Sequence, residues 1–383
     1  MATIVSHPAA LCFSGNIPDA VIASSSAEVT VEILKGAEVI ASEIYNPVDG
    51  QFIIRLRDLV TKMLEVHLPP IEYYNPASFS AFEQEDAAAT ITVNITDSGT
   101  VSFSFKAIKG GIDPSINTVD FVAQNFLSWQ PQVKKIHYWD PNYLSFYAQQ
   151  NLDIFAKGYF ASGSPQVIRL GSLDADKLYT WSMLYPFMLP LFAEPIAAFD
   201  VWMEYQGTRV SNIQRFVYTI EYDDYPDTFL WENSLGGIDT VRFTGIKTES
   251  NNLSYALALI NKESFPYDIN FEKSFAKTTG EIDNDAERQW ILDFFYSLQQ
   301  YHFVNPAFNP IVVSKPKLDS VNLEMNAYEF SFAYAIPNQY FNLPRLSDLP
   351  DIVIDAPPEE TDFEITTGDG TPITDSSENI ITT

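Results

Sequence analysis

The sequence pattern that constrains the fold most is a strict alternation of apolar and polar residues on both sides of a short turn. The turn, Asp97-Ser98-Gly99, consists of residues that favour tight turns. The alternating apolar residues are Ile91, Val93 and Ile95 before it, and Val101, Phe103 and Phe105 after it. A period of two places these side chains on one face of each strand. The segment is therefore predicted to be a β-hairpin with one buried face.

Two more strand-like runs precede this hairpin. Residues 38–45 and 51–56 are separated by the turn-forming cluster Asn46-Pro47-Val48-Asp49-Gly50. Short strands at this spacing are typical of β-sandwiches. We therefore predict an N-terminal immunoglobulin-like β-sandwich over residues 1–107.

The chain up to residue 345 also favours strands over helices. Residues 108–198 are aromatic-rich and are predicted to form an irregular or β region, whereas residues 199–345 are predicted to form a β-rich module. The strand-like runs of that module are 199–205, 214–222, 228–232, 239–244, 321–325 and 328–334. Phe (28) and Tyr (20) are abundant, and aromatic residues favour strands, so the whole chain is predicted to be mainly β.

One amphipathic helix is predicted within the β-rich module. Asn284 precedes Glu287 by three residues, which is the spacing of a capping box at a helix N-terminus. The apolar residues that follow at helical spacing are Trp290, Ile291, Phe294, Phe295 and Leu298. The helix is expected to run from about residue 285 to residue 300.

The composition changes after Arg345. Residues 346–383 contain ten acidic residues and no Lys or Arg, so this segment is predicted to be an extended acidic C-terminal tail. Two short apolar runs in it, which contain Ile352, Ile354 and Phe363, are short enough to add as strands to the sheet edge of another chain.

The net charge excludes two kinds of partner. The chain has 22 Lys and Arg against 50 Asp and Glu, a formal charge of −28, so we expect no direct binding to nucleic acid or to anionic membrane surfaces.

The cysteine content and the N-terminal sequence predict the compartment. Cys12 is the single cysteine and no basic residue precedes Lys35, as expected of a protein that stays in a reducing cytosol without a signal peptide. The longest uncharged stretch, residues 178–193, is too short to span a membrane unaided.

No motif for catalysis, for a cofactor or for a metal is apparent. The four histidines, His7, His67, His137 and His302, are far apart in sequence and form no paired ligand motif. The acidic cluster Asp223, Asp224 and Asp227 lacks the spacing of a calcium loop, so a solvated loop is expected there. Gly236-Gly237 lacks the Lys of a phosphate-binding loop, so a tight turn is expected. Paired glycosidase carboxylates have no fixed sequence spacing, which leaves a glycan hydrolase as a third alternative.

An aromatic run is the best candidate for a recognition surface. Its members are Trp129, Tyr138, Trp139, Tyr143, Phe146 and Tyr147. Exposed Trp and Tyr side chains anchor protein interfaces or stack on sugar rings. Aromatic side chains equally often fill a core, so both interpretations remain open. We take Trp129, Tyr138, Trp139 and Tyr143 as possible interface residues.

Four stretches of the chain occur in an order that is similar to one known family. They are Phe13-Ser14-Gly15-Asn16-Ile17-Pro18-Asp19 with Tyr45-Asn46-Pro47-Val48-Asp49-Gly50, then Phe126-Leu127-Ser128-Trp129-Gln130-Pro131-Gln132, then 230–245, and then Thr278-Thr279-Gly280 before the Trp290 helix. In this order, over about residues 10–335, they resemble β-rich structural proteins of tailed phages and prophages of gut bacteria. Residues 162–200 and the acidic tail lie outside the resemblance.

The resemblance implies a virion or tail component without catalytic residues. Such a protein is an oligomer that contacts its own copies and other particle proteins, and it resides in a virion or phage-like particle assembled in the bacterial cytoplasm. The position in the particle stays open among capsid, connector, tail and baseplate. The alternative is a host-surface or glycan-binding adhesin module at a tail tip.

Overall fold

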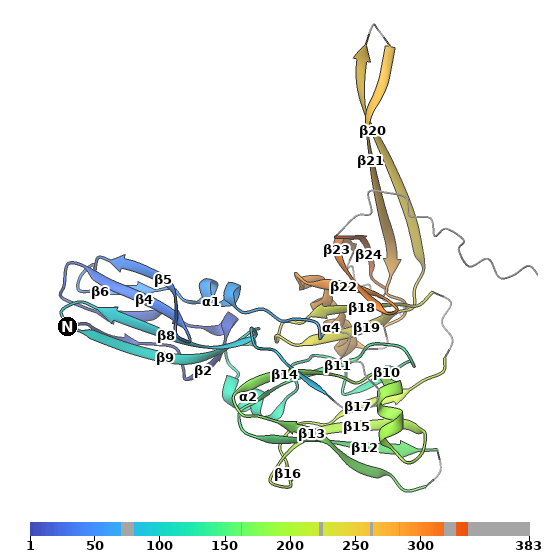
Figure 1. Cartoon of the computed structure of the whole chain (residues 1–383), viewed down its shortest axis with the longest axis horizontal. Coiled ribbons are helices and arrows are strands. Elements are labelled where there is room, and N and C mark those ends of the chain that lie inside the picture. Colours follow the sequence, from blue (N-terminus) through green and yellow to red (C-terminus); the bar gives the residue numbers. More distant parts are fainter. Residues whose placement is uncertain are drawn as a thin grey trace, which may run out of the picture. The chain divides into compact units, whose positions relative to one another are not determined.

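The computed structural model describes residues 1–69, 80–161, 163–221, 225–260, 263–282, 284–317 and 327–335, all within one compact unit. The fold is mainly β, as predicted, with strands distributed over several sheets (Figure 1). Three modules follow one another along the chain. The predicted strand at 321–325 and the acidic tail at 346–383 lie outside the described residues.

The N-terminal module is a two-sheet sandwich. Its first sheet has the order β1-β3-β6 and its second the order β2-β9-β8-β4-β5, which matches the division of strands between the two sheets of immunoglobulin domains. The strands are β1 (Thr3–Ser6), β2 (Leu11–Phe13), β3 (Ala20–Ala23), β4 (Val29–Lys35), β5 (Glu38–Tyr45), β6 (Gln51–Ile54), β8 (Ala88–Thr96) and β9 (Thr100–Ile108), and a short 3-10 helix η1 (Ser14–Asn16) follows β2. The predicted immunoglobulin-like sandwich is thus confirmed.

The predicted hairpin is the pair β8 and β9. Ile91 pairs with Phe105 and Val93 pairs with Phe103, and the apolar face of the hairpin is buried in the core between the two sheets. Alternation along the sequence therefore identified both the strands and the face that they bury.

The chain leaves the sandwich between β6 and β8. Here it forms the helix α1 (Arg57–Met63) and the strand β7 (Ala81–Glu83). β7 pairs with β14 of the second module, with Glu83 opposite Tyr179. The first module thus contributes a strand to a sheet of the second.

The second module packs a six-stranded sheet against a three-stranded one. The larger sheet has the order β10-β17-β15-β12-β13, with β16 beside β15, and the smaller has the order β11-β14-β7. The strands are β10 (Val133–Ile136), β11 (Tyr143–Ala148), β12 (Leu152–Phe160), β13 (Gln166–Leu173), β14 (Lys177–Ser182), β15 (Ile196–Tyr205), β16 (Thr208–Arg209) and β17 (Gln214–Tyr218), and the helices are α2 (Thr118–Gln124), α3 (Tyr185–Met188) and the 3-10 helix η3 (Leu189–Leu191).

Residues 108–198 contain regular strands, which is the β alternative of the prediction for this region. The predicted boundary after residue 198 was wrong, because it divides a single sheet in which β12 pairs with β15 along most of its length. The strand β11 was not recognised in the sequence because both of its faces are buried, so its apolar and polar residues do not alternate.

The third module is a seven-stranded sheet covered by one helix. Its strand order is β19-β18-β22-β23-β24-β21-β20. The strands are β18 (Asp227–Glu232), β19 (Ile238–Phe243), β20 (Lys247–Ile260), β21 (Glu263–Thr278), β22 (Gln300–Val304), β23 (Ala307–Lys317) and β24 (Glu329–Tyr334). No helix in the described residues is long and apolar enough to cross a membrane.

The helix α4 (Asp285–Tyr296) is the predicted amphipathic helix, but it is shorter than predicted. Its N-terminus is capped as expected, since the Asn284 side chain accepts a hydrogen bond from the backbone N–H of Glu287 at 2.9 Å. Trp290 and Phe294 are buried, and both rings contact Trp231 on β18. The helix ends before Leu298, which is fully exposed (100%), so the predicted apolar face includes one residue too many.

A shared core joins the three modules. It contains Phe13 and Ile108 from the sandwich, Leu127 and Tyr143 from the second module, and residues of the third module. The contribution of the third module includes Leu235, in the loop between β18 and β19. The modules are therefore held together by apolar side chains that all three supply.

Replacing Trp290 with Ala should lower the free energy of unfolding by about 3–5 kcal/mol, because it empties a large buried site in the core under α4. Leu298→Ala is the matched control, since it removes a fully exposed side chain and should change stability by less than about 0.5 kcal/mol. Urea denaturation of the two variants measures both values. Equal effects would contradict the packing described for this helix.

Candidate functional site

Three of the four residues of the aromatic run that were predicted to form an interface are exposed. Trp129, Tyr138 and Trp139 lie in the segment that leads into β11, and the Trp139 side chain is 58% exposed. Tyr143 is 1% exposed and belongs to the shared core, so its assignment as an interface residue was wrong. The reason is that β11 lies between two cores and exposes neither face.

Tyr138 and Trp139 form one end of an aromatic stack. The Tyr138 ring meets the Trp139 ring edge-on, with centroids 4.9 Å apart, and also contacts Tyr185 of α3. Tyr185 stacks on Tyr218 at 3.9 Å and donates a hydrogen bond to the backbone carbonyl of Ile196 at 2.5 Å. The exposed pair thus packs on the buried ring of Tyr185 and, through it, on the partly buried ring of Tyr218.

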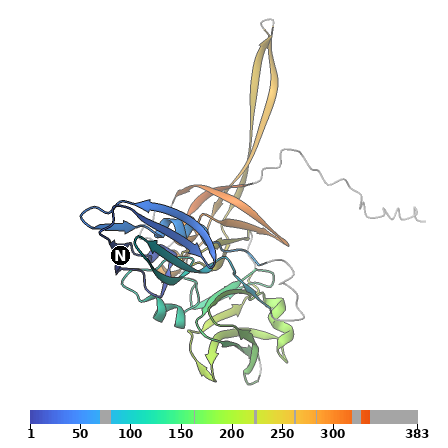
Figure 2. The ribbon, with the colours of Figure 1, turned by 60° about the vertical axis from the view of Figure 1, so that its left-hand side comes forward.

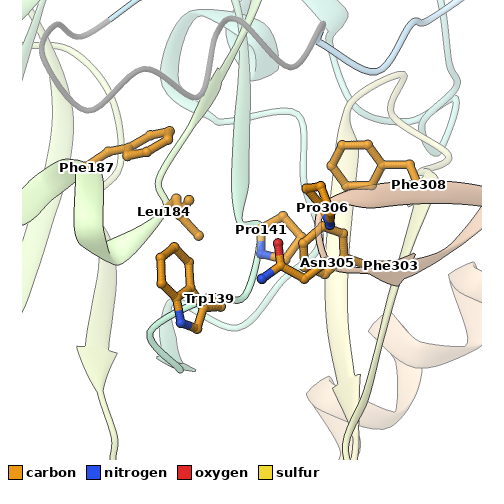
Figure 3. Close-up of a pocket in the computed structure, with 8 residues that line it drawn as sticks. All are labelled: Trp139, Pro141, Leu184, Phe187, Phe303, Asn305, Pro306 and Phe308. Atoms are coloured by element: carbon orange, nitrogen blue, oxygen red, sulfur yellow. The ribbon is translucent and has the colours of Figure 1, made fainter. Parts of the chain in front are cut away.

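Beside this pair is an apolar pocket of about 190 Å³ (Figure 3). Its lining consists of Trp139, Pro141, Leu184, Phe187, Phe303, Asn305, Pro306 and Phe308, none of which is charged. Trp139, Leu184 and Phe187 lie on one side, and the residues from β22, β23 and the turn between them lie on the other (Figure 3). Pockets for drug-sized ligands typically measure roughly 300–1,000 Å³, so this one is better matched to one large side chain or one sugar ring.

Buried polar contacts fix one side of the aromatic segment to the third module. The Lys134 ammonium donates hydrogen bonds to Gln130 Oε1 at 3.1 Å and to the backbone carbonyl of Thr240 at 2.6 Å. The Asp239 carboxylate accepts hydrogen bonds from the Ser128 hydroxyl at 2.5 Å and from Trp290 Nε1 at 2.8 Å. These contacts hold residues 128–134 against β19 and α4.

Burial perturbs the pKa of both charged groups in this cluster. It raises the pKa of Asp239 to about 6, although hydrogen bonds from Ser128 and Trp290 act in the opposite direction. It lowers the pKa of Lys134 to about 8, although the nearby carboxylates favour the charged form. Because both groups are fully buried, the cost of removing their charges from water offsets much of the attraction between them.

A second buried contact fixes the other side. The Asp140 carboxylate accepts hydrogen bonds from the Thr228 hydroxyl and from Arg242, both at 3.0 Å. Trp139 therefore lies next to an anchored residue, and the pocket is lined by segments held in a defined arrangement.

A third cluster surrounds Asp227 at the start of β18. Its carboxylate contacts His302 Nε2 and Lys277 Nζ, each at 2.9 Å, and also Lys247. Burial opposes ionisation, but the hydrogen bonds from these three side chains hold the pKa of Asp227 well below its usual range.

The expectation of a solvated loop was therefore wrong for Asp227, whose side chain is buried by these partners. Its neighbours Asp223 and Asp224 lie outside the described residues. Within the described parts of the chain, no group of His, Cys, Asp and Glu side chains is arranged to hold a metal ion.

The pair β20 and β21 forms a long hairpin that sequence reasoning missed. Lys247 pairs with Lys277 at its base, and the ladder continues to Ile260 opposite Glu263. Among the described residues, only the last four of β21 pair with a third strand, β24, and the rest of the hairpin forms a two-stranded ribbon (Figures 1 and 2). Tyr255 and Leu257 on β20 are 54% and 61% exposed.

One sequence signal for this hairpin was present. Leu253, Tyr255, Leu257 and Leu259 occur at every second position of β20. Ser and Ala separate them, so the contrast between apolar and polar positions is weak. The strong alternation that identified β8 and β9 is therefore missing from β20.

Comparisons with known proteins give little help with this site. No family model and no curated protein matches the chain. A solved structure described as "Crystal structure of DIP-gamma IG1+IG2" aligns with 58% of this chain and 98% of its own, at 8% sequence identity and a TM-score of 0.18. A likeness this low carries no argument about function.

The buried Asp239 should make stability depend on pH. The pKa of Asp239 in the folded state, about 6, lies above the ordinary value of an Asp side chain, so the folded state binds the proton more tightly than the unfolded state does. The resulting contribution to the free energy of unfolding is present at low pH and is lost as the pH rises through 6. Relative to Asp239→Asn, in which residue 239 cannot titrate, the wild type should lose roughly 2 kcal/mol of unfolding free energy between pH 4 and pH 7.

Urea denaturation of both proteins at several pH values measures this difference. A difference that stays constant, or that changes in favour of the wild type as the pH rises, would contradict the assignment.

Proposed function

We propose that this chain is a structural component of a phage or phage-tail-like particle and acts through protein–protein interfaces. The observation that carries the proposal is the β20–β21 hairpin. A two-stranded hairpin on its own is at best marginally stable in water, and its open edges are templates for pairing with another chain. Such a hairpin, with exposed Tyr255 and Leu257, is expected in a protein whose working state is an assembly.

Other features support the same proposal. Trp129, Tyr138 and Trp139 present aromatic side chains of the type that dominate protein interfaces. The sequence resemblance to phage structural proteins agrees with a chain built of several β modules. The anchored aromatic segment provides a surface with a defined shape, which favours specific association.

The second candidate is a glycan-binding adhesin module. Trp139 favours it, because an exposed Trp beside an uncharged hollow provides a face on which a sugar ring stacks. A glycan array distinguishes the two candidates. Binding that disappears in Trp139→Ala would favour the adhesin, whereas the structural role predicts no signal above background. No arrangement in the described residues favours the third alternative, a glycan hydrolase.

The proposal predicts that the protein is a stoichiometric part of a particle. Particles purified by density gradient from the bacterium that carries this gene should contain the chain at a fixed number of copies per particle. Quantitative mass spectrometry measures that number, and electron microscopy with a labelled antibody locates the chain. Absence from particles, or a copy number that varies between preparations, would overturn the proposal.

The acidic tail provides a further test. Truncation after Arg345 removes Ile352, Ile354 and Phe363, which we propose as strand-adding contacts to a neighbouring chain. The truncated monomer should keep its circular dichroism spectrum and melting temperature but fail to enter the assembly. Normal assembly without the tail would remove this role, and unfolding of the truncated monomer would make the tail part of the fold.

A further inference from the structure

We infer that the apolar pocket beside Trp139 receives the β20–β21 hairpin of a second copy of this chain, with Tyr255 and Leu257 as the anchoring side chains. The inference rests on the proposed structural function and specifies its partner and its contact. It follows from two surfaces of one chain that match in chemistry and in form.

The first match is between the exposed apolar side chains of the hairpin and the apolar lining of the pocket. Tyr255 and Leu257 are two residues apart on β20 and therefore lie on one face of the strand. The ladder skips a residue between Asp268 and Pro266, so the irregularity lies on β21 and the alternation on β20 is kept. The pocket, at about 190 Å³, has room for one of these two side chains, and the exposed ring of Trp139 at its rim is an apolar surface for the other.

The second match is electrostatic. The hairpin, residues 247–278, contains four Lys and four Asp or Glu, so its formal charge is 4 − 4 = 0 in a chain whose total is −28. The remaining residues thus carry the entire −28, and two copies repel each other over most of their surfaces. A neutral hairpin and an uncharged pocket are the surfaces that two copies can bring together with the least repulsion. This charge distribution favours a second copy as the occupant.

The base of the hairpin is built to position it. Lys247 of β20 and Lys277 of β21 both contact the buried carboxylate of Asp227 on β18. Lys277 also donates hydrogen bonds to the backbone carbonyls of Tyr225 at 2.6 Å and Gly245 at 2.7 Å. The two strands are thus fixed where they leave the sheet, while their distal part stays available for a partner.

The contact joins two different surfaces, so it is heterologous. Interfaces of this kind generate rings when the rotation between copies closes, and filaments when it does not. Either outcome is an assembly of many copies, as a particle component requires.

Engineered cysteines test the contact directly. Cys12 is buried, and burial raises the pKa of its thiol to about 12, so it does not compete with exposed thiols. Leu257→Cys and Asn305→Cys are made as separate full-length proteins, mixed and oxidised mildly. We expect a disulfide-linked dimer from this mixture. Leu257→Cys mixed with Ile44→Cys, an exposed position on the sandwich, is the matched control and should give none.

A second pair of variants tests the anchors. Tyr255→Ser combined with Leu257→Ser should weaken self-association at least tenfold, and because both side chains are exposed the melting temperature of the monomer should stay unchanged. Ile44→Ser, which removes an equally exposed apolar side chain, should leave association unchanged. Analytical ultracentrifugation over a concentration series measures these effects.

The outcomes separate this inference from the function on which it rests. A chain that enters particles normally but shows no Leu257→Cys to Asn305→Cys cross-link overturns the inference alone. So does a dominant dimer of Leu257→Cys with itself, which would show that hairpins pair edge to edge. A third protein carries both Leu257→Cys and Asn305→Cys, and a disulfide formed within one such chain rather than between two chains would also overturn the inference. A chain that neither self-associates nor enters particles overturns the proposed function as well.

Discussion

The close approach of three backbone segments at the module junction is the constraint on which the rest of the structure depends. A Cβ atom at Gly236 would lie 2.1 Å from the carbonyl oxygen of Lys109, and one at Gly237 would lie 2.0 Å from that of Leu127. Gly236 also has a φ of +78°, which favours glycine. The loop between β18 and β19 is the predicted tight turn, and its glycines additionally let the third module contact the other two. With any larger residue there, the backbones would have to separate and the shared core would open.

The pocket and the hairpin are supported in different ways. Trp139 and Phe303, from different modules, line the same pocket, and Asp140 is bound to Arg242 of the third module. The hairpin is anchored at its base, through Lys277 and its partners. The pocket has a defined shape, and the hairpin makes few contacts beyond its base. The two surfaces are suited to opposite sides of one interface, because a preorganised pocket reduces the total entropic cost of association.

Elements whose sequence pattern lies within a few neighbouring residues could be predicted from the sequence. The hairpin of β8 and β9 buries one face, and the cap at Asn284 needs only a residue three positions away. The boundary after residue 198 failed because β12 and β15 pair across about forty residues of chain, which no local period reports. Trp139 was found as an exposed aromatic, but Phe303 and Asn305 were not, since their place in the pocket depends on packing between modules. The β20–β21 hairpin was missed because Ser and Ala separate the apolar residues of β20, so the contrast between apolar and polar positions is weak.

Hydrogen exchange of the full chain, followed by mass spectrometry as concentration rises from monomer to assembly, tests most directly whether the hairpin is an intermolecular element. In the monomer, the backbone amides of residues 250–260 and 263–274 should exchange much faster than those of β18 and β22, because within the described residues these parts of β20 and β21 pair only with each other. On assembly, the ribbon and the turn at Asn305 should become protected together. Slow exchange of the ribbon in the monomer, or no change in either segment on assembly, would contradict the account.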